Sequence, residues 1–130
     1  MKRLIAILSF IIFVSAGCSP APAKTDYRQI SMTEAVSMME KEKDYIILDV
    51  RTEEEYADEH IPGAICIPNE TIGSEEMEKL PDKNQLILVY CRSGNRSKQA
   101  SQKLADMGYT NIVEFGGIID WMGETVSGDL

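Results

Sequence analysis

The chain has 130 residues, of which 44% are hydrophobic and 26% charged, a composition typical of one globular domain. This length excludes a long multidomain assembly, and the composition excludes a disordered chain. The formal net charge is −8, and without Lys2 and Arg3 the remainder carries 11 basic against 21 acidic residues, a net charge of −10. This acidity argues against nonspecific nucleic-acid binding, but it is compatible with a positive local pocket for a small anion.

The first 17 residues have the pattern of an export signal peptide. Lys2 and Arg3 precede an apolar run, 4–14, and small residues then lead to Cys18. This run rises about 16 Å as a helix, roughly half of a bilayer core, which disfavours a permanent transmembrane span. The small residues before Cys18 resemble a bacterial lipobox, which predicts export, cleavage before Cys18 and a lipid anchor at a bacterial membrane. The alternative is an ordinary secretory signal followed by an unrelated cysteine.

A flexible tether and one domain follow the predicted signal peptide. Residues 18–26 contain Pro20 and Pro22 and show no apolar periodicity, which is typical of an extended tether. Residues 27–130 are numerous enough to bury one hydrophobic core. This domain contains only Cys66 and Cys91, which excludes a disulfide-rich secreted scaffold.

Capping signals and apolar runs alternate along the domain. Capping boxes at 31–34 and 52–55 predict a helix over about 32–42, with methionines in the core, and a short acidic helix that ends near Glu59. The remaining pattern predicts strands at 45–50, 64–67, 86–90 and 112–115, a helical turn or two within 74–80, a helix over 96–107, and a short helix carrying Trp121. This alternation indicates an α/β fold with a mainly parallel sheet.

The segment between the strongest predicted strand and the next helix reads CRSGNR, from Cys91 to Arg96. Such a loop binds anions, because free N–H groups and the positive end of the helix dipole converge there. The same groups stabilise a thiolate, Arg92 and Arg96 add positive charge, and Gly94 and Asn95 can adopt left-handed backbone. The pattern therefore predicts an exposed nucleophilic thiolate at Cys91 beneath an anion pocket. The alternative is a buried structural cysteine, the usual state of a free thiol.

The other candidate groups have simpler interpretations. Cys66 lies in an apolar segment, AICIP, without a basic neighbour, and we interpret it as structural. His60 is the single histidine, and we interpret it as a structural hydrogen-bonding residue and not as a base. One histidine and two separated cysteines show no metal-ligand spacing, so we expect no metal and no cofactor.

Four segments resemble the rhodanese-like domain family, in the order in which the family has them. They are LDVR at 48–51, EY at 55–56 with HIPGA at 60–64, CRSGNRS at 91–97, and GG at 116–117 with Trp121. The likeness extends over the chain from about Tyr27 onward. One departure is Glu59, where the family usually has glycine before the histidine.

The resemblance implies a five-stranded, mainly parallel sheet with helices on both faces, and sulfur transfer through a cysteine persulfide. The donor would be thiosulfate or a persulfide, and the acceptor a thiol or cyanide. Carried over residue by residue, Cys91 is the nucleophile, and Asp49 and Arg51 are a supporting acid and base for which we expect ion pairing. The substrate-binding residues implied by the resemblance are Arg92, Ser93, Gly94, Asn95 and Arg96.

Two other functions fit parts of the pattern. A phosphatase or arsenate reductase also combines a cysteine and an arginine around an anion, but the related families have one more residue between the two. Four residues separate Cys91 from Arg96, which favours sulfur over phosphate. A noncatalytic binding module would keep the fold without turnover, and the intact cysteine and arginines argue against it.

Overall fold

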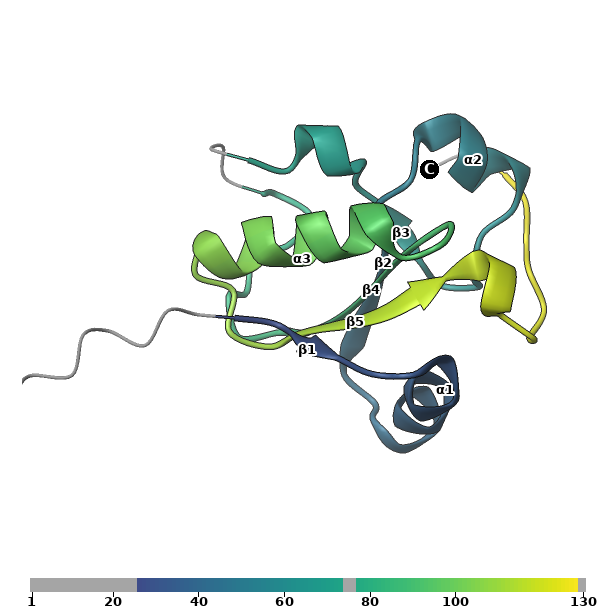
Figure 1. Cartoon of the computed structure of the whole chain (residues 1–130), viewed down its shortest axis with the longest axis horizontal. Coiled ribbons are helices and arrows are strands. Elements are labelled where there is room, and N and C mark those ends of the chain that lie inside the picture. Colours follow the sequence, from purple (N-terminus) through teal and green to yellow (C-terminus); the bar gives the residue numbers. More distant parts are fainter. Residues whose placement is uncertain (1–25, 74–76, 129–130) are drawn as a thin grey trace, which may run out of the picture.

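The computed structural model describes residues 26–73 and 77–128, and it confirms the predicted α/β class (Figure 1). Five strands, all parallel, form one sheet in the order β1-β5-β4-β2-β3. The strands are β1 (Arg28–Gln29), β2 (Tyr45–Asp49), β3 (Ile65–Cys66), β4 (Leu86–Cys91) and β5 (Ile112–Gly117). The helices are α1 (Met32–Lys41), α2 (Glu53–Asp58) and α3 (Asn95–Asp106), with 3₁₀ turns η1 (Asn69–Thr71) and η2 (Ile118–Asp120).

The predicted signal peptide, 1–17, and the tether, 18–26, lie outside the described residues except for Asp26. Within 26–73 and 77–128, no helix is long and apolar enough to cross a membrane. Export and the lipid anchor at Cys18 therefore stay predictions from the sequence.

Side-chain caps begin the first two helices, but not the third. Ser31 accepts a hydrogen bond from the Glu34 N–H at 3.1 Å where α1 begins, and Thr52 and Glu55 form a complete capping box at α2. The N-cap of α3 is Gly94, which makes no side-chain cap hydrogen bond. The first N–H groups of α3 therefore lack a side-chain acceptor, which leaves this helix end suited to an anion.

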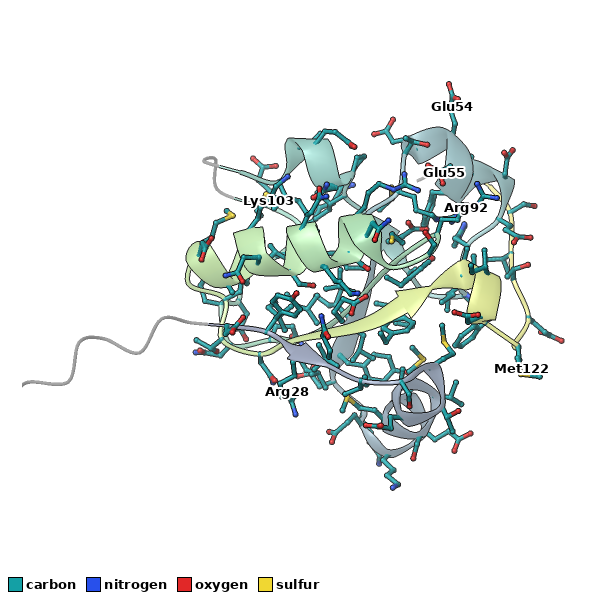
Figure 2. All side chains as sticks on the ribbon, in the orientation of Figure 1. Arg28, Glu54, Glu55, Arg92, Lys103 and Met122 are labelled. Atoms are coloured by element: carbon teal, nitrogen blue, oxygen red, sulfur yellow. The ribbon has the colours of Figure 1, made fainter. Side chains whose placement is uncertain are left out.

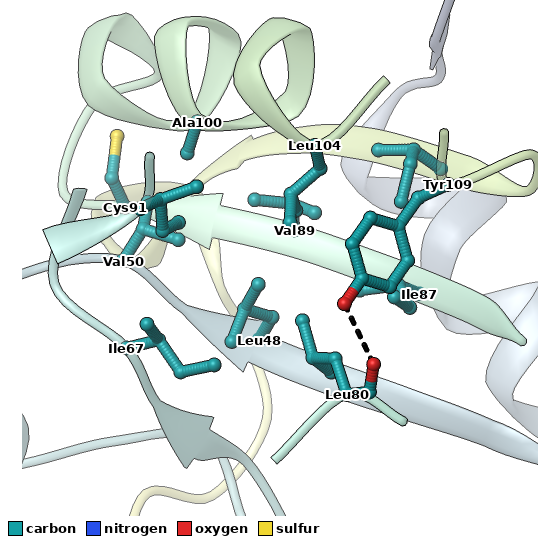
Figure 3. Packing of buried hydrophobic residues seen from close by; sticks show 12 residues of the cluster. Leu48, Val50, Ile67, Leu80, Ile87, Val89, Cys91, Ala100, Leu104 and Tyr109 are labelled. Carbon is teal, nitrogen blue, oxygen red and sulfur yellow. Dashed lines mark hydrogen bonds between the residues drawn. The ribbon is translucent and has the colours of Figure 1, made fainter. Parts of the chain in front are cut away.

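The central strand β4 sends its side chains alternately into two cores, as strand geometry requires. Val89 and Cys91 face the core beneath α3, in a cluster that includes Ala100 and Leu104 (Figure 3). Leu88 and Tyr90 face the other core, which α1 and α2 cover. This alternation places the Cys91 side chain under α3, at the carboxyl end of the sheet.

Four local predictions differ from the structure. The sequence does not predict β1, because two exposed residues are too few to show alternation. The helical turns expected within 74–80 do not occur in the described part, 77–80, where Leu80 is anchored in the core and accepts the Tyr109 hydroxyl at 2.6 Å. The turn η1 forms earlier and was not predicted. Trp121 follows η2 instead of lying within a helix.

Candidate active site

Cys91 is the last residue of β4, and it is buried, with 1% exposure. The prediction of an exposed loop thiol is therefore wrong, because Cys91 still pairs in the sheet with Gly117 and its side chain faces the α3 core. Its Sγ accepts a hydrogen bond from the Gly94 N–H at 3.0 Å and lies 3.4 Å from the Ser97 hydroxyl. The N–H group and the start of α3 supply the positive potential that stabilises a thiolate.

Two glycines let the loop close tightly over this thiol. Gly94 has a φ of 108°, in the left-handed region that a side chain disfavours. At Gly117, a Cβ atom would lie 1.9 Å from the Arg92 carbonyl oxygen, which leaves no room for any side chain. The pair Gly116–Gly117 is the end of β5, and Gly117 allows this strand to approach the loop.

The loop arginine Arg96 is bound by a carboxylate. Its guanidinium donates to both oxygens of Glu55 on α2, at 2.6 and 3.1 Å. This hydrogen bonding lowers the pKa of Glu55 to about 2, so the pair stays charged at neutral pH. The sequence predicts that Arg96 attracts the anionic donor, and in the structure its guanidinium links α2 to the loop. Its charge still acts electrostatically on Cys91.

Arg92 differs from Arg96, because it is exposed and forms no ion pair within the described part of the chain. It lies at the edge of the molecule close to α2 (Figure 2). Arg92 lines a pocket of about 500 Å³ together with Arg51, Glu55, Asp58, Glu59, Ile118 and Ile119. Of the other predicted substrate-binding residues, Ser93 and Asn95 are exposed and Gly94 is buried.

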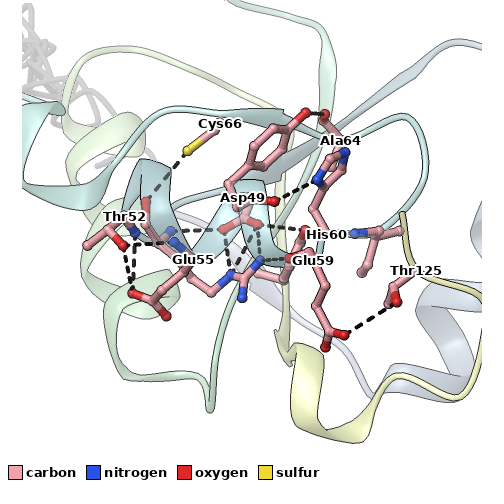
Figure 4. A network of polar contacts seen from close by, with 12 residues as sticks. Asp49, Thr52, Glu55, Glu59, His60, Ala64, Cys66 and Thr125 are labelled. Carbon is pink, nitrogen blue, oxygen red and sulfur yellow. Dashed lines mark hydrogen bonds and ion pairs between the residues drawn. The ribbon is translucent and has the colours of Figure 1, made fainter. Parts of the chain in front are cut away.

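Asp49 and Arg51 form a buried ion pair at 2.7 Å (Figure 4). Asp49 also accepts the Tyr90 hydroxyl at 2.8 Å, and Arg51 donates to the Glu59 carbonyl at 2.6 Å. Burial and the Asp49 carboxylate raise the pKa of Tyr90, so its hydroxyl stays a donor. Tyr90 and Cys91 face opposite sides of β4, so this network supports the end of the sheet and does not touch the thiol.

A profile of the rhodanese-like domain matches residues 31–124. The chain belongs to the rhodanese-like domain family. It is 42% identical over 73 residues to the thiosulfate sulfurtransferase PspE of Escherichia coli, which covers 56% of this chain and 70% of that protein. It is also 32% identical over 104 residues to the thiosulfate sulfurtransferase GlpE of Coxiella burnetii, covering 79% of this chain and 94% of that protein.

Solved structures of other rhodanese-like domains have the same fold. A rhodanese from E. coli solved with anions is 39% identical, with a TM-score of 0.59 over 65% of this chain and 99% of that one. A rhodanese-like protein from Staphylococcus aureus is 30% identical, with a TM-score of 0.66 over 78% of this chain and 99% of that one. These comparisons confirm the predicted fold.

The second cysteine of this rhodanese-like domain lies in surroundings that disfavour a thiolate. Cys66 donates to the Arg51 carbonyl at 3.6 Å, and burial together with the Asp49 carboxylate raises its pKa to about 11. His60 has its Nδ1 2.7 Å from the Tyr56 carbonyl, and its ring stacks on that tyrosine at 3.7 Å. In the described residues, no cluster of three metal-ligating side chains occurs.

Two side chains beneath the rhodanese loop are missing from the predicted site. Ser97, just inside α3, lies within 3.4 Å of the Cys91 sulfur, and its hydroxyl is 2.7 Å from Glu114 Oε1. Glu114, in β5, is 3% exposed and also accepts the Gly116 N–H at 2.8 Å. The sequence holds a signal for Glu114, because a single carboxylate inside the apolar strand 112–115 is costly to bury unless hydrogen-bond donors bind it.

Proposed function

We propose that this protein is a sulfurtransferase that carries the transferred sulfur as a persulfide on Cys91. The observation that carries this proposal is the Gly94 N–H at 3.0 Å from the Cys91 sulfur, at the start of α3. This arrangement stabilises a thiolate, and a cysteine that served only to pack the core would not need one. The similarity to two thiosulfate sulfurtransferases supports the activity and supports thiosulfate as the donor.

The reaction requires only nucleophilic substitution at sulfur. The Cys91 thiolate attacks the outer sulfur of thiosulfate, a new S–S bond forms, and the old S–S bond breaks with its electron pair leaving on sulfite. The persulfide anion is then attacked at its terminal sulfur by cyanide or a thiolate, which removes that sulfur and regenerates the Cys91 thiolate. Sulfur and charge balance in both steps, and no external oxidant or reductant is needed.

The arginines have separate functions in this proposal. Arg92 is the exposed charge that attracts an anionic donor, because Arg96 is already bound to Glu55. Three carboxylates, Glu55, Asp58 and Glu59, line the pocket beside Arg92 and weaken its attraction for a dianion. Because Arg92 acts by attracting the donor, we expect Arg92→Ala to raise the KM for thiosulfate more than it lowers kcat, and the three carboxylates limit the size of this effect.

The alternatives are less well supported. A phosphatase or arsenate reductase needs an arginine directed at a tetrahedral oxyanion, and here Glu55 occupies the guanidinium of Arg96 with two hydrogen bonds. A noncatalytic module would have no need for an N–H group directed at Cys91. Both alternatives predict that thiosulfate leaves the Cys91 peptide unchanged.

Mass spectrometry of the purified protein after incubation with thiosulfate tests the proposal. We expect the peptide containing Cys91 to gain one sulfur atom and to lose it when cyanide is added. Cys91→Ser should abolish thiocyanate formation, and the matched variant Cys66→Ser should keep most of it. Sulfur on Cys66, or activity in Cys91→Ser, would show that the nucleophile is assigned wrongly.

We also propose, from the sequence, that the chain is exported, cleaved before Cys18 and held at a bacterial membrane by acyl chains on that cysteine. Two or more acyl chains give stable anchoring, whereas the net negative charge of the domain disfavours electrostatic adhesion to anionic lipid. Expressed in full, the protein should fractionate with membranes, and Cys18→Ala should stay uncleaved or become a soluble exported protein. A soluble wild-type chain that still begins at Met1 would contradict this proposal.

A further inference from the structure

Glu114 is a buried carboxylate beside the proposed nucleophile, and the proposed sulfur transfer gives it no function. Its Oε1 accepts the Gly116 N–H at 2.8 Å and lies 2.7 Å from the Ser97 hydroxyl, and the residue is 3% exposed. Among the described residues, no lysine, arginine or histidine forms an ion pair with it. A carboxylate buried without a cation is costly, so its hydrogen bonds to Gly116 and Ser97 decide how its charge is accommodated.

Ser97 connects this carboxyl to the thiol and can donate only one hydrogen. Its hydroxyl has four neighbours: Glu114 Oε1 at 2.7 Å, the Gly94 carbonyl at 3.0 Å, and the Gly116 carbonyl and Cys91 Sγ at 3.4 Å. An ionised Glu114 takes the Ser97 hydrogen, so the hydroxyl can only accept from a Cys91 thiol. A protonated Glu114 donates to Ser97, whose own hydrogen is then free to bind a Cys91 thiolate.

We propose that Glu114 is a positioning residue that takes up the Cys91 proton through Ser97 when the thiolate forms. The S–H proton moves to Ser97 Oγ while the Ser97 hydrogen moves to Glu114 Oε1, so one S–H and one O–H bond break and two O–H bonds form. The pair then holds one negative charge wherever the proton lies. This inference rests on the proposed function, in which the Cys91 thiolate is the attacking group.

The consequence concerns the approach of an anionic donor. Without a proton on Glu114, a thiosulfate dianion would meet a thiolate and a carboxylate joined by one hydroxyl. With the proton on Glu114, only the sulfur is negative, and the N–H of Gly94 faces it. The shared proton therefore makes a thiolate available without adding charge to the buried site.

The surrounding charged groups do not take the place of the Ser97–Glu114 contact beside the Cys91 sulfur. The Asp49–Arg51 pair and Tyr90 lie on the opposite face of the sheet, as does α1. By element, the charged groups on the near side include Arg92 in the loop, Arg96, Lys98 and Lys103 on α3, Glu55 on α2 and Glu70 on η1. All six are at least partly exposed, whereas Ser97 and Glu114 are buried.

The pH profile of Cys91 alkylation tests the shared proton. Two coupled groups lose their protons in two steps. In the wild type, the rate of iodoacetamide labelling of the Cys91 peptide should therefore rise twice with pH, with a plateau between the rises. Glu114→Gln keeps the shape of the side chain and cannot take the proton, so it should give one rise, at a pH between the two. A single rise in the wild type, or two rises in Glu114→Gln, would overturn the inference.

Two serines on α3 provide the matched controls. Ser97→Ala removes the bridging hydroxyl and should lower the plateau by about threefold to tenfold, the effect of one lost hydrogen bond. Ser101→Ala removes a buried hydroxyl that has no hydrogen-bond partner in the part of the chain that the structure describes, and it should leave the profile unchanged. Equal profiles for the two variants would contradict the function given to Ser97.

A measurement on the wild type makes the test independent of whether the variants fold. Alkylation at the plateau pH removes the thiolate, so Glu114 should lose its proton, and the infrared difference spectrum should lose the C=O band of a protonated carboxyl. No loss of this band would overturn the inference. A two-step profile without persulfide formation would instead contradict only the proposed sulfur transfer, and persulfide formation with a one-step profile would contradict only the shared proton.

Discussion

The two cysteines of the described domain, Cys91 and Cys66, differ in their surroundings and not in their burial. Each is 1% exposed, and each is the last residue of a parallel strand. Cys91 accepts the Gly94 N–H and lies at the start of α3, whereas Cys66 faces the Arg51 carbonyl and the Asp49 carboxylate. The two cysteines therefore differ in the groups directed at the sulfur, and we expect those groups, and not burial, to decide which sulfur reacts as a thiolate.

The difference arises from the segment that comes after each strand. After β4 the chain passes through three residues, 92–94, the last of them a left-handed glycine, and enters α3, so the Gly94 N–H points back at the sulfur. After β3 the chain continues through Pro68 into η1, which has no side-chain cap and only three residues. Position at the carboxyl edge of the sheet is therefore not sufficient for a reactive cysteine.

The largest expected effect is the contrast in alkylation rate. With its pKa raised to about 11, Cys66 is ionised to about one part in ten thousand at pH 7, so it should react slowly with iodoacetamide. Its rate should rise about tenfold per pH unit until about pH 11. Peptide mass spectrometry should find Cys91 labelled at least about 100-fold faster at pH 7. Equal rates in the folded protein would show that the loop does not stabilise the anion.

A smaller effect is expected from Gly117→Ala, which should make Cys91 more like Cys66 by displacing the loop. Its Cβ would lie 1.9 Å from the Arg92 carbonyl, so the loop must shift away from β5. We expect a loss of about 1–3 kcal/mol in the free energy of unfolding. The alkylation rate of Cys91 should fall roughly tenfold to a hundredfold toward that of Cys66, because the hydrogen bond to the thiolate is weakened.

Gly73→Ala is the matched control, since no atom of the described residues lies within 4 Å of its Cβ position and its φ is not left-handed. This variant should leave both the stability and the two alkylation rates close to those of the wild type. Retention of the fast Cys91 reaction in Gly117→Ala would show that the close approach of β5 is not what holds the loop.

Much of this contrast could be predicted from the sequence. The alternation of capping boxes and apolar runs gives the α/β fold, and CRSGNR after the strongest strand indicates the anion site. The burial of Cys91 could not be predicted, because it depends on the strand continuing by one residue to pair with Gly117. The Arg96–Glu55 and Ser97–Glu114 contacts join residues that are 41 and 17 positions apart in the sequence. A local sequence pattern cannot show that such distant residues meet.

The smallest effect on stability is expected from Glu55→Gln, which releases Arg96 near Cys91. The pKa of Glu55 is lowered to about 2 in the fold, below the ~4.3 of an unfolded chain, so its stabilisation is present above about pH 4.3 and is lost as pH falls through about 2. Because the pair is 28% and 31% exposed, we expect a cost of only about 1 kcal/mol at pH 7. In the wild type the free energy of unfolding should fall between about pH 4.3 and about 2 as Glu55 takes up a proton, and Glu55→Gln should lack this part of the fall.

Glu55→Gln should lower the stability but improve donor binding and the reactivity of Cys91. A guanidinium released from Glu55 adds positive potential to the pocket beside Arg92, so the KM for thiosulfate should fall and Cys91 alkylation should become faster, while Cys66 is unaffected. Glu54→Gln is the control, because this neighbouring carboxylate on α2 is exposed and points away from the loop (Figure 2). It removes the same charge without releasing Arg96. If both variants lower the KM equally, the effect is one of net charge, and the Arg96–Glu55 pair does not govern donor binding.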